Sequence, residues 1–237
     1  MFTTLITGAN RGLGLDFARQ YAEDGWRVIA CCRTPADAAE LQDLAKQYDG
    51  VTIEKLDVCD RGAVDALARE CAGQPIDVLL NNAGIIGPIP IAEHVERQQF
   101  GTMDYEVWRD VVETNTFAPL KMAEAFVEHV AASEQKKIVN ISSTVGSITE
   151  MSVDALAYAS SKSALNRVMT TVAEQLSQRG IIVALFCPGY VKTRMDAYGY
   201  AMVEIEQSVS ALRTLIAALT LEDAGSFTRY DGQPIAW

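Results

Sequence analysis

Tyr158 and Lys162 are four residues apart in the segment YASSK, at the start of a long helical pattern. Residues at this spacing lie on the same face of an α-helix, so the lysine ammonium can stay close to the phenol. A nearby cation favours the phenolate and lowers the tyrosine pKa from its usual value of about 10. The pair therefore suits general acid–base chemistry, although most pairs of this kind are solvated surface residues.

An alternation of strand and helix patterns must position this pair. Short apolar runs such as FTTLITG and IDVLLNN alternate with longer helical patterns, and the runs are apolar throughout, as in parallel strands covered on both faces. We expect an α/β fold, a doubly wound parallel sheet in a single domain spanning 1–237. The expected helices are 12–24, 36–47, 60–72, 104–133 with a bend at Pro119, 156–179 and 206–220.

Composition limits the function classes. The net charge of -11 argues against a general nucleic-acid or anionic-membrane binder. The sequence shows no cationic start followed by an apolar stretch, so we expect no signal peptide. No apolar run approaches the roughly 18 residues of a membrane span. His94 and His129 lack partners at metal-ligand spacing, so we expect surface histidines and no metal. The five cysteines fit neither a disulfide framework nor a zinc site and predict a reducing compartment, the cytoplasm: Cys31, Cys32, Cys59, Cys71 and Cys187.

The first apolar run leads directly into TGANRGLG, and a helical pattern follows. Glycines allow the backbone to approach a phosphate closely, and a helix N-terminus at the end of a parallel strand offers free N–H groups to a pyrophosphate. An ordinary glycine-rich turn is the alternative. The expected dinucleotide contacts are Gly8, Asn10, Arg11, Gly12, Leu13 and Gly14.

The end of the second strand indicates which dinucleotide. A site for NAD usually has an acidic residue there, which accepts hydrogen bonds from the ribose. Here Arg33 follows the strand, and Arg11 lies in the glycine loop; guanidinium groups suit a phosphate. We therefore expect NADP(H) rather than NAD(H). Asp57 and Val58, after the third strand, are expected near the adenine, although Asp57 could equally cap a helix.

With TGANRGLG, NNAG, Asn115, Ser143, YASSK and PGYVKT in this order, the sequence resembles the short-chain dehydrogenase/reductase family over its whole length. The ending FTRYDGQPIAW is similar to the carbonyl-reductase and C-factor-like branch. The resemblance implies a Rossmann-type sheet of about seven strands and a catalytic tetrad of Asn115, Ser143, Tyr158 and Lys162.

The resemblance also assigns roles. Tyr158 would be the general acid in reduction, Lys162 its electrostatic partner and a ligand of the nicotinamide ribose, and Ser143 a donor to the substrate oxygen. Asn115 would support a water chain to Lys162. Ser142 is an alternative to Ser143. We prefer Ser143 because it directly precedes the turn 144–146. The separation of Ser143 and Tyr158 is fifteen, two more than is usual in the family.

Further contacts are implied beside the nicotinamide end. The segment 194–206, with Met195, Tyr198, Tyr200 and Met202, is a candidate lid or else a surface loop packed on the core. Helices 105–132 and 156–179 would pair in a homodimer or homotetramer. Residues implied near the ribose are Asn82, Ala83 and Gly84, and those implied around the nicotinamide are Pro188, Gly189, Val191 and Thr193.

The leading hypothesis is an NADPH-dependent carbonyl reductase acting on a small aldehyde or ketone. An NAD-linked alcohol dehydrogenase is a second hypothesis, which Arg11 and Arg33 disfavour. A non-catalytic protein that binds a dinucleotide to sense redox state is a third, which the presence of both Tyr158 and Lys162 disfavours.

Overall fold

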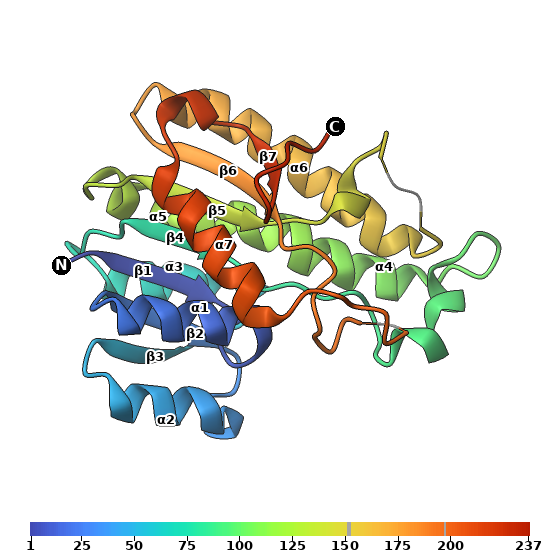
Figure 1. Cartoon of the computed structure of the whole chain (residues 1–237), viewed down its shortest axis with the longest axis horizontal. Coiled ribbons are helices and arrows are strands. Elements are labelled where there is room, and N and C mark those ends of the chain that lie inside the picture. The colour runs from blue at the N-terminus through green and yellow to red at the C-terminus, as the bar shows by residue number, and fades with distance from the viewer. Residues whose placement is uncertain (151–152, 197) are drawn as a thin grey trace.

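A parallel sheet forms the centre of the protein (Figure 1). The structure, a computed structural model, describes residues 1–150, 153–196 and 198–237. These residues form a seven-stranded sheet in the order β3-β2-β1-β4-β5-β6-β7, with every neighbouring pair parallel, which confirms the predicted fold class. The strands are β1 Thr3–Thr7, β2 Arg27–Cys32, β3 Val51–Lys55, β4 Val78–Asn81, β5 Lys137–Ile141, β6 Ile182–Cys187 and β7 Phe227–Arg229.

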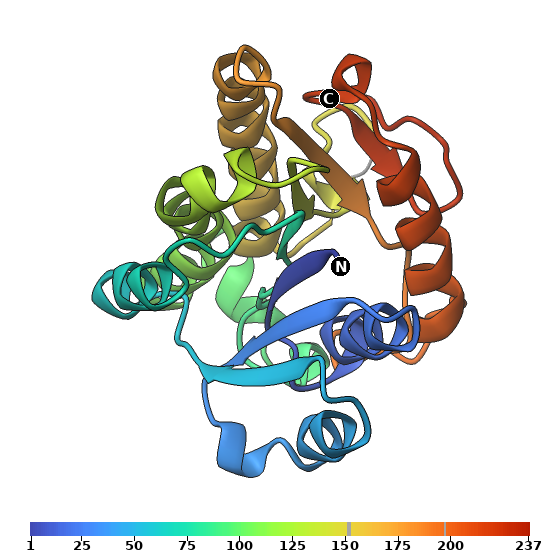
Figure 2. The same ribbon diagram turned by 90° about the vertical axis from the view of Figure 1, so that its left-hand side faces the viewer.

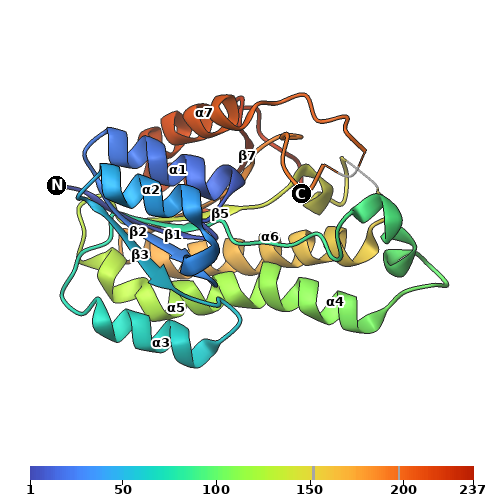
Figure 3. The same cartoon turned by 90° about the horizontal axis from the view of Figure 1, so that it is seen from below.

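Helices cover both faces of the sheet, as the views from the N-terminal side (Figure 2) and from below (Figure 3) show. Helices α1, α2 and α7 pack on one face, and α3, α5 and α6 pack on the other. The helices are α1 Gly12–Glu23, α2 Ala39–Gln47, α3 Arg61–Glu70, α4 Tyr105–Val112, α5 Ala118–Ala131, α6 Leu156–Ser177 and α7 Ile205–Ala218.

Alternate residues of a strand enter opposite cores, which explains the uninterrupted apolar runs. In β1, Leu5 packs in the core under α3, α5 and α6, whereas Ile6 packs under α1, α2 and α7. Every residue of β1, β5 and β6 is buried, while the edge strand β3 has only Val51 fully buried. The central strands therefore carry apolar residues at both parities, as parallel sheets require.

The predicted helix 104–133 is two helices joined by a π-helical segment, Glu113–Phe117. The irregularity lies before Pro119, which occupies the first turn of α5, rather than at the proline itself. Side chains from this segment bond to neighbouring elements: Thr116 Oγ1 donates to the carbonyl of Ser161 at 2.9 Å, and Asn115 bonds to Ile85. Such single π turns occur frequently at functional sites.

The sheet order reverses between β1 and β4, so their carboxyl ends diverge into separate loops at the centre of the sheet. These ends face the side of the molecule that carries the segments 85–104 and 188–196 (Figure 1). In open α/β sheets, ligands bind in the crevice at this position. Among the described residues, no helix has both the length and the apolar character to cross a membrane.

The expectation that His129 lies on the surface is wrong. Its ring packs against Phe126, with 5.2 Å between ring centroids, and both ring nitrogens are buried without a hydrogen-bond partner among the described residues. His129 is on the last turn of α5, where its backbone carbonyl accepts a hydrogen bond from the amide of Ile76. Spacing along the sequence carries no information on this packing.

Candidate active site

The glycine loop between β1 and α1 brings strand and helix into close backbone contact. Gly8 has a φ of +68°, which side chains rarely tolerate, and a Cβ on Gly14 would lie 2.3 Å from the carbonyl oxygen of Gly8. The side-chain amide of Asn82 donates to the backbone carbonyls of Thr7 and Gly8 at 2.9 and 3.2 Å. Asn82 therefore fixes the loop that was expected to bind phosphate, in addition to lining the same cavity.

The N-terminus of α1 has no capping side chain and no acidic residue in its first turn. In contrast, Asp60 caps α3 and Asp104 caps α4, each by accepting backbone N–H groups. The uncapped amides of α1 and the positive end of its dipole face the cavity and suit an anion. Asp57 does not cap α3; its carboxylate accepts the amide of Cys59 at 3.0 Å and lines the cavity.

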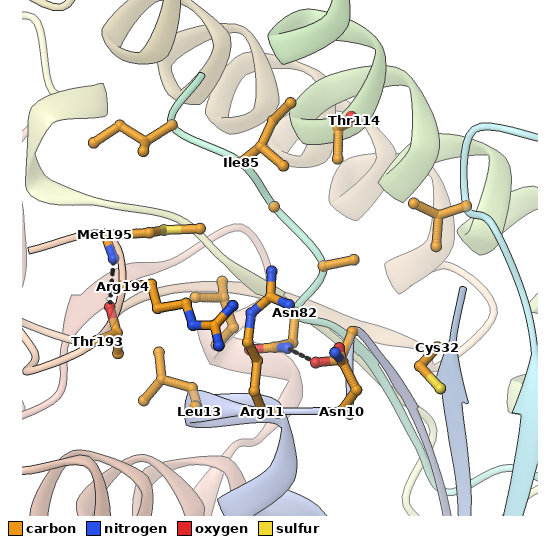
Figure 4. A pocket seen from close by; sticks show the side chains of 18 of the residues that line it. Asn10, Arg11, Leu13, Cys32, Asn82, Ile85, Thr114, Thr193, Arg194 and Met195 are labelled. Carbon is orange, nitrogen blue, oxygen red and sulfur yellow. Dashed lines mark hydrogen bonds between the residues drawn. The ribbon is translucent and has the colours of Figure 1, made fainter. Parts of the chain in front are cut away.

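Three arginines surround one end of the cavity. Arg11 and Arg33 were expected there, and Arg194, from the loop after β6, joins them; Figure 4 shows the Arg194 and Arg11 side chains next to each other. None of the three forms an ion pair within the part of the chain that the structure describes, although Asp37 and Glu40 line the same recess. Partial burial and the charges of Arg194 and Arg33 lower the pKa of Arg11, which marks a positive electrostatic potential.

Tyr158 and Lys162 lie on α6 at the other end of the cavity. Lys162 is buried, its Nζ donates to the carbonyl of Ile141 at 2.9 Å, and it lies 5.9 Å from the centroid of the Tyr158 ring. Burial lowers the pKa of Lys162 to about 8. Burial also raises the pKa of Tyr158 to about 12, and a hydrogen bond with the Ser143 side chain acts in the opposite direction.

The structure does not show the expected effect of Lys162 on the pKa of Tyr158. Loss of solvation raises that pKa, the contribution that lowers it comes from Ser143, and the Lys162 ammonium is directed to the carbonyl of Ile141. A tyrosine with a raised pKa keeps its proton at neutral pH. The arrangement therefore provides a proton donor rather than a ready base.

Asn115 is fully buried behind this pair. Its Oδ1 accepts the amide of Ile85 at 2.9 Å, and its Nδ2 donates to the carbonyl of Ile85 at 2.8 Å and to Ser161 Oγ at 3.0 Å. The side chain thus joins the segment after β4, at Ile85, to α6. The π-helical segment turns Asn115 inward so that it reaches both.

The two adjacent serines after β5 have different environments. Ser142 is buried and its hydroxyl donates to Asn166 Oδ1 at 2.6 Å, which ties β5 to α6. Ser143 is half-buried and forms the hydrogen bond with Tyr158 described above. The geometry therefore favours Ser143 as the serine that faces a reacting group. Met151 and Ser152, in the lengthened segment before Tyr158, lie outside the described residues.

The loop after β6 is organised by Asp196. Its carboxylate accepts the backbone amides of Gly199, Tyr200 and Ala201 at 2.9, 3.2 and 3.1 Å, and the Tyr190 hydroxyl at 2.6 Å. Two further backbone hydrogen bonds join Tyr190 to the far end of the loop. The loop is therefore closed on itself, which fixes where its first residues meet the cavity.

Of the apolar side chains expected in a lid, only Met195 lines the cavity. Tyr198, Tyr200 and Met202 are exposed, and the two tyrosine rings stack with centroids 6.3 Å apart. Ala197, within the expected lid 194–206, lies outside the described residues. The apolar pattern alone did not show which of these side chains turns inward.

The cavity has a volume of about 530 Å³ and brings most of the predicted site residues together. Asn115, Ser143, Gly189 and Val191 do not line it: Asn115 lies behind the wall, and Val191 is buried in a bridge with Val203. A Cβ on Gly189 would lie 2.7 Å from the ring of Tyr230, so this glycine allows close packing.

Sequence reasoning missed several lining residues. Arg194 directly follows a predicted contact, Thr193, and its charge beside the phosphate loop was a usable signal. The others are mainly apolar residues after strand ends, and no sequence signal distinguishes them from core residues. They include Leu56, Ile85, Ile86, Ile89, Thr114, Ile141 and Ile205.

Comparison with known proteins assigns the chain to a family. The model of the short chain dehydrogenase family matches residues 3–203. The chain belongs to the short-chain dehydrogenase family. Its predicted Rossmann-type fold and its likeness to carbonyl reductases are both confirmed.

Two solved structures illustrate the relationship. The NADPH-bound carbonyl reductase from chicken fatty liver is 31% identical, with a TM-score of 0.90 over 99% of this dehydrogenase and 98% of that chain. The carbonyl reductase Sniffer of D. melanogaster is 30% identical, with a TM-score of 0.88 over 100% of both chains. A curated relative, the 1-hydroxy-2-glutathionyl-2-methyl-3-butene dehydrogenase of Rhodococcus sp. (strain AD45), is 31% identical over 244 residues, 100% of each chain.

Proposed function

We propose that this dehydrogenase is an NADPH-dependent carbonyl reductase that converts an aldehyde or ketone to an alcohol. The observation that carries the proposal is the position of Tyr158, beside Ser143 and Lys162, at one end of a cavity whose other end is surrounded by three arginines. The family assignment and the NADPH-bound relative support it.

The residues around the cavity fit a phosphorylated dinucleotide. The uncapped N-terminus of α1 and the glycine loop suit the pyrophosphate, and Arg11 and Arg33 suit a 2′-phosphate. Arg194 adds a third guanidinium to the same recess. When bound, the dinucleotide supplies the hydride that reduces the carbonyl carbon.

Proton transfer falls to the residues of α6 and β5. Tyr158 donates its hydroxyl proton to the carbonyl oxygen, which becomes the alcohol oxygen, and Ser143 donates a hydrogen bond to the same oxygen as negative charge develops there. Lys162, with a pKa of about 8, can take up and release a proton near neutral pH and thereby reprotonate Tyr158. Asn115 holds the wall through which this exchange with solvent occurs.

The catalytic end of the cavity is largely apolar. Ile85, Ile86, Ile89 and Met195 contribute apolar side chains to the cavity that Tyr158 also lines. Among the described residues that line the cavity, the cations other than Lys162 are Lys192, which pairs with Glu204, and the three arginines that suit the cofactor phosphates, so none is left to pair with a charged substrate. We therefore infer an uncharged, apolar carbonyl substrate.

The test is a binding titration with NADPH and with NADH, followed by turnover with a panel of uncharged aldehydes and ketones that begins with 4-nitrobenzaldehyde. Stronger binding of NADPH together with oxidation of NADPH by a carbonyl supports the proposal. Stronger binding of NADH contradicts the role of the arginines. Strong NADPH binding without turnover of any panel member contradicts the reductase and favours the dinucleotide-sensing alternative.

A further inference from the structure

Gln98 is a fully buried polar residue far from Tyr158 in sequence and outside the predicted site. It lies in a 3₁₀-helical turn, Val95–Gln98, of the segment that links β4 to α4. Its Oε1 accepts the backbone amide of Tyr158 at 3.1 Å, and its Nε2 donates to the carbonyl of Ile86 at 2.6 Å. Both polar atoms of the side chain are therefore used, one on each wall of the active site.

The first turn of α6 needs such a partner. The helix begins at Leu156, so Tyr158 is the third helical residue, and the residue at the N-cap is Ala155, whose side chain cannot accept a hydrogen bond. A helix normally satisfies the amide of its third residue with a Ser, Thr, Asp or Asn at the N-cap. Here Gln98 provides that acceptor from another part of the chain.

Gln98 and Asn115 form hydrogen bonds with adjacent residues, Ile86 and Ile85, of the segment after β4. Asn115 bonds to both backbone groups of Ile85 and reaches Ser161 on α6, while Gln98 bonds to Ile86 and reaches Tyr158 on the same helix. Two buried amides thus set the separation between α6 and the segment after β4. That separation decides where the Tyr158 hydroxyl lies relative to the cavity.

The backbone around Gln98 is adapted to this contact. Gly87 has a φ of +107°, and a Cβ there would lie 2.6 Å from Gln98 Nε2. The ion pair between Arg97 and Asp104, with a shortest distance of 2.6 Å, closes the far side of the turn. Gln98 is therefore held by a formed turn and a glycine that makes room for it.

We propose that Gln98 is a positioning residue that caps the first turn of α6 from outside the helix and thereby holds Tyr158 in its proton-donating position. The inference rests on the proposed role of Tyr158. Loss of the cap lets the first turn of α6 loosen, because a buried amide loses its acceptor. A displacement of about 1 Å at a reacting group can lower turnover by about a hundredfold.

The test uses four variants of the full chain: Gln98→Leu, Ala155→Ser, the double variant, and Gln99→Leu as the matched control. A serine at position 155 can accept the amide of the third helical residue from within the helix and so replaces the lost cap. The readouts are kcat and KM for 4-nitrobenzaldehyde, the Kd for NADPH, and hydrogen exchange of the peptide that contains Tyr158.

Gln98→Leu is expected to lower kcat about 10- to 100-fold, with the Kd for NADPH within about threefold, and to speed exchange at the start of α6. Ala155→Ser in the same chain is expected to restore much of kcat and of the exchange protection. Ala155→Ser and Gln99→Leu alone are expected to behave like the parent protein.

The inference is overturned if Gln98→Leu leaves kcat and exchange at α6 unchanged, or if Ala155→Ser restores neither. An equal loss of kcat, cofactor binding and thermal stability would also overturn it, since that pattern indicates general loosening. Hydrogen exchange needs no substrate, so the capping contact is tested even when no panel carbonyl is turned over. If Tyr158→Phe retains full turnover, the proposed function is contradicted. Hydrogen exchange at α6 tests the capping contact separately, so the two failures can be told apart.

Discussion

The two ends of the cavity differ in the exposure of their charged and polar side chains and in whether these have partners. At one end, Arg11, Arg33 and Arg194 are exposed, carry like charges and have no ion-pair partner among the described residues. At the other end, Lys162 and Asn115 are buried, and their polar atoms have defined partners. Recognition at the first end depends on charge and tolerates small displacements, whereas the second end depends on position.

This difference should appear in the response to salt and to substitution. Exposed charges are screened over a Debye length of about 8 Å at physiological ionic strength, and buried hydrogen bonds are not. Substitution of one arginine therefore should weaken binding by a moderate factor. Loss of one buried or reacting group should abolish turnover or change stability while binding persists.

The largest expected effect is that of Tyr158→Phe. Removal of the hydroxyl removes the proton donor, so kcat is expected to fall by about 10³-fold or more while the Kd for NADPH changes little. Steady-state kinetics and a fluorescence titration measure the two quantities. Tyr105→Phe, at an exposed tyrosine on α4, is the control and should leave both unchanged. Turnover close to that of the parent protein would remove Tyr158 from the mechanism.

The second prediction separates the adjacent serines. Ser143→Ala is expected to lower kcat about 10²- to 10³-fold, because it removes a donor to the substrate oxygen, with little loss of stability. Ser142→Ala leaves Asn166 Oδ1 without its donor and is expected to lower the free energy of unfolding by about 1–3 kcal/mol, with a much smaller effect on kcat. Steady-state kinetics and urea unfolding of both variants distinguish the two serines. The reverse pattern would assign the proposed catalytic role to Ser142.

The third prediction concerns the arginine end. Arg33→Gln and Arg194→Gln are each expected to weaken NADPH binding about 10- to 100-fold and to leave NADH binding within about twofold, because a charge-assisted hydrogen bond to the 2′-phosphate is lost. The NADPH affinity of the parent protein should also fall with rising salt. Arg167→Gln, on α6, serves as control. Equal weakening for both dinucleotides would place the contact at the pyrophosphate instead.

The smallest expected effect is a change in the pH dependence of stability. Burial lowers the pKa of Lys162 to about 8 from 10.5, so between these values the unfolded chain binds a proton that the folded protein has released. The unfolding free energy contributed by this group therefore rises with pH across that window. Lys162→Met should remove this rise, as urea unfolding between pH 7.5 and 9.5 can show; Lys55→Met, at an exposed strand end, should retain it.

Above pH 10, Tyr158 and Tyr21, whose pKa values burial raises to about 12, act in the opposite direction. Burial raises the pKa of Tyr158 to about 12, so the unfolded chain loses its phenolic proton first and stability falls as pH rises from 10 toward 12. Below pH 10 the difference between Lys162→Met and the parent protein isolates Lys162, because Lys137 and the buried cysteines, whose pKa values burial also shifts, are present in both. A slope that is identical in Lys162→Met and the parent protein would show that Lys162 keeps its ordinary pKa in the fold.

The sequence by itself determined the sheet, the glycine loop and the elements that carry the proposed catalytic residues. Apolar runs and helical periodicity are local consequences of burial on two faces, so strand and helix positions could be predicted within a few residues. The glycine loop and the Tyr158–Lys162 pair were equally local, because both depend on spacing within one segment.

Only the tertiary structure decided which distant residues complete the site. Arg194 meets Arg11 because the loop after β6 folds back toward α1, and Gln98 reaches Tyr158 across 60 positions. The pKa of Tyr158 also depends on desolvation by the surrounding elements, which raises it. Contacts between distant segments and the loss of solvent are properties of packing, and no spacing within a segment records them.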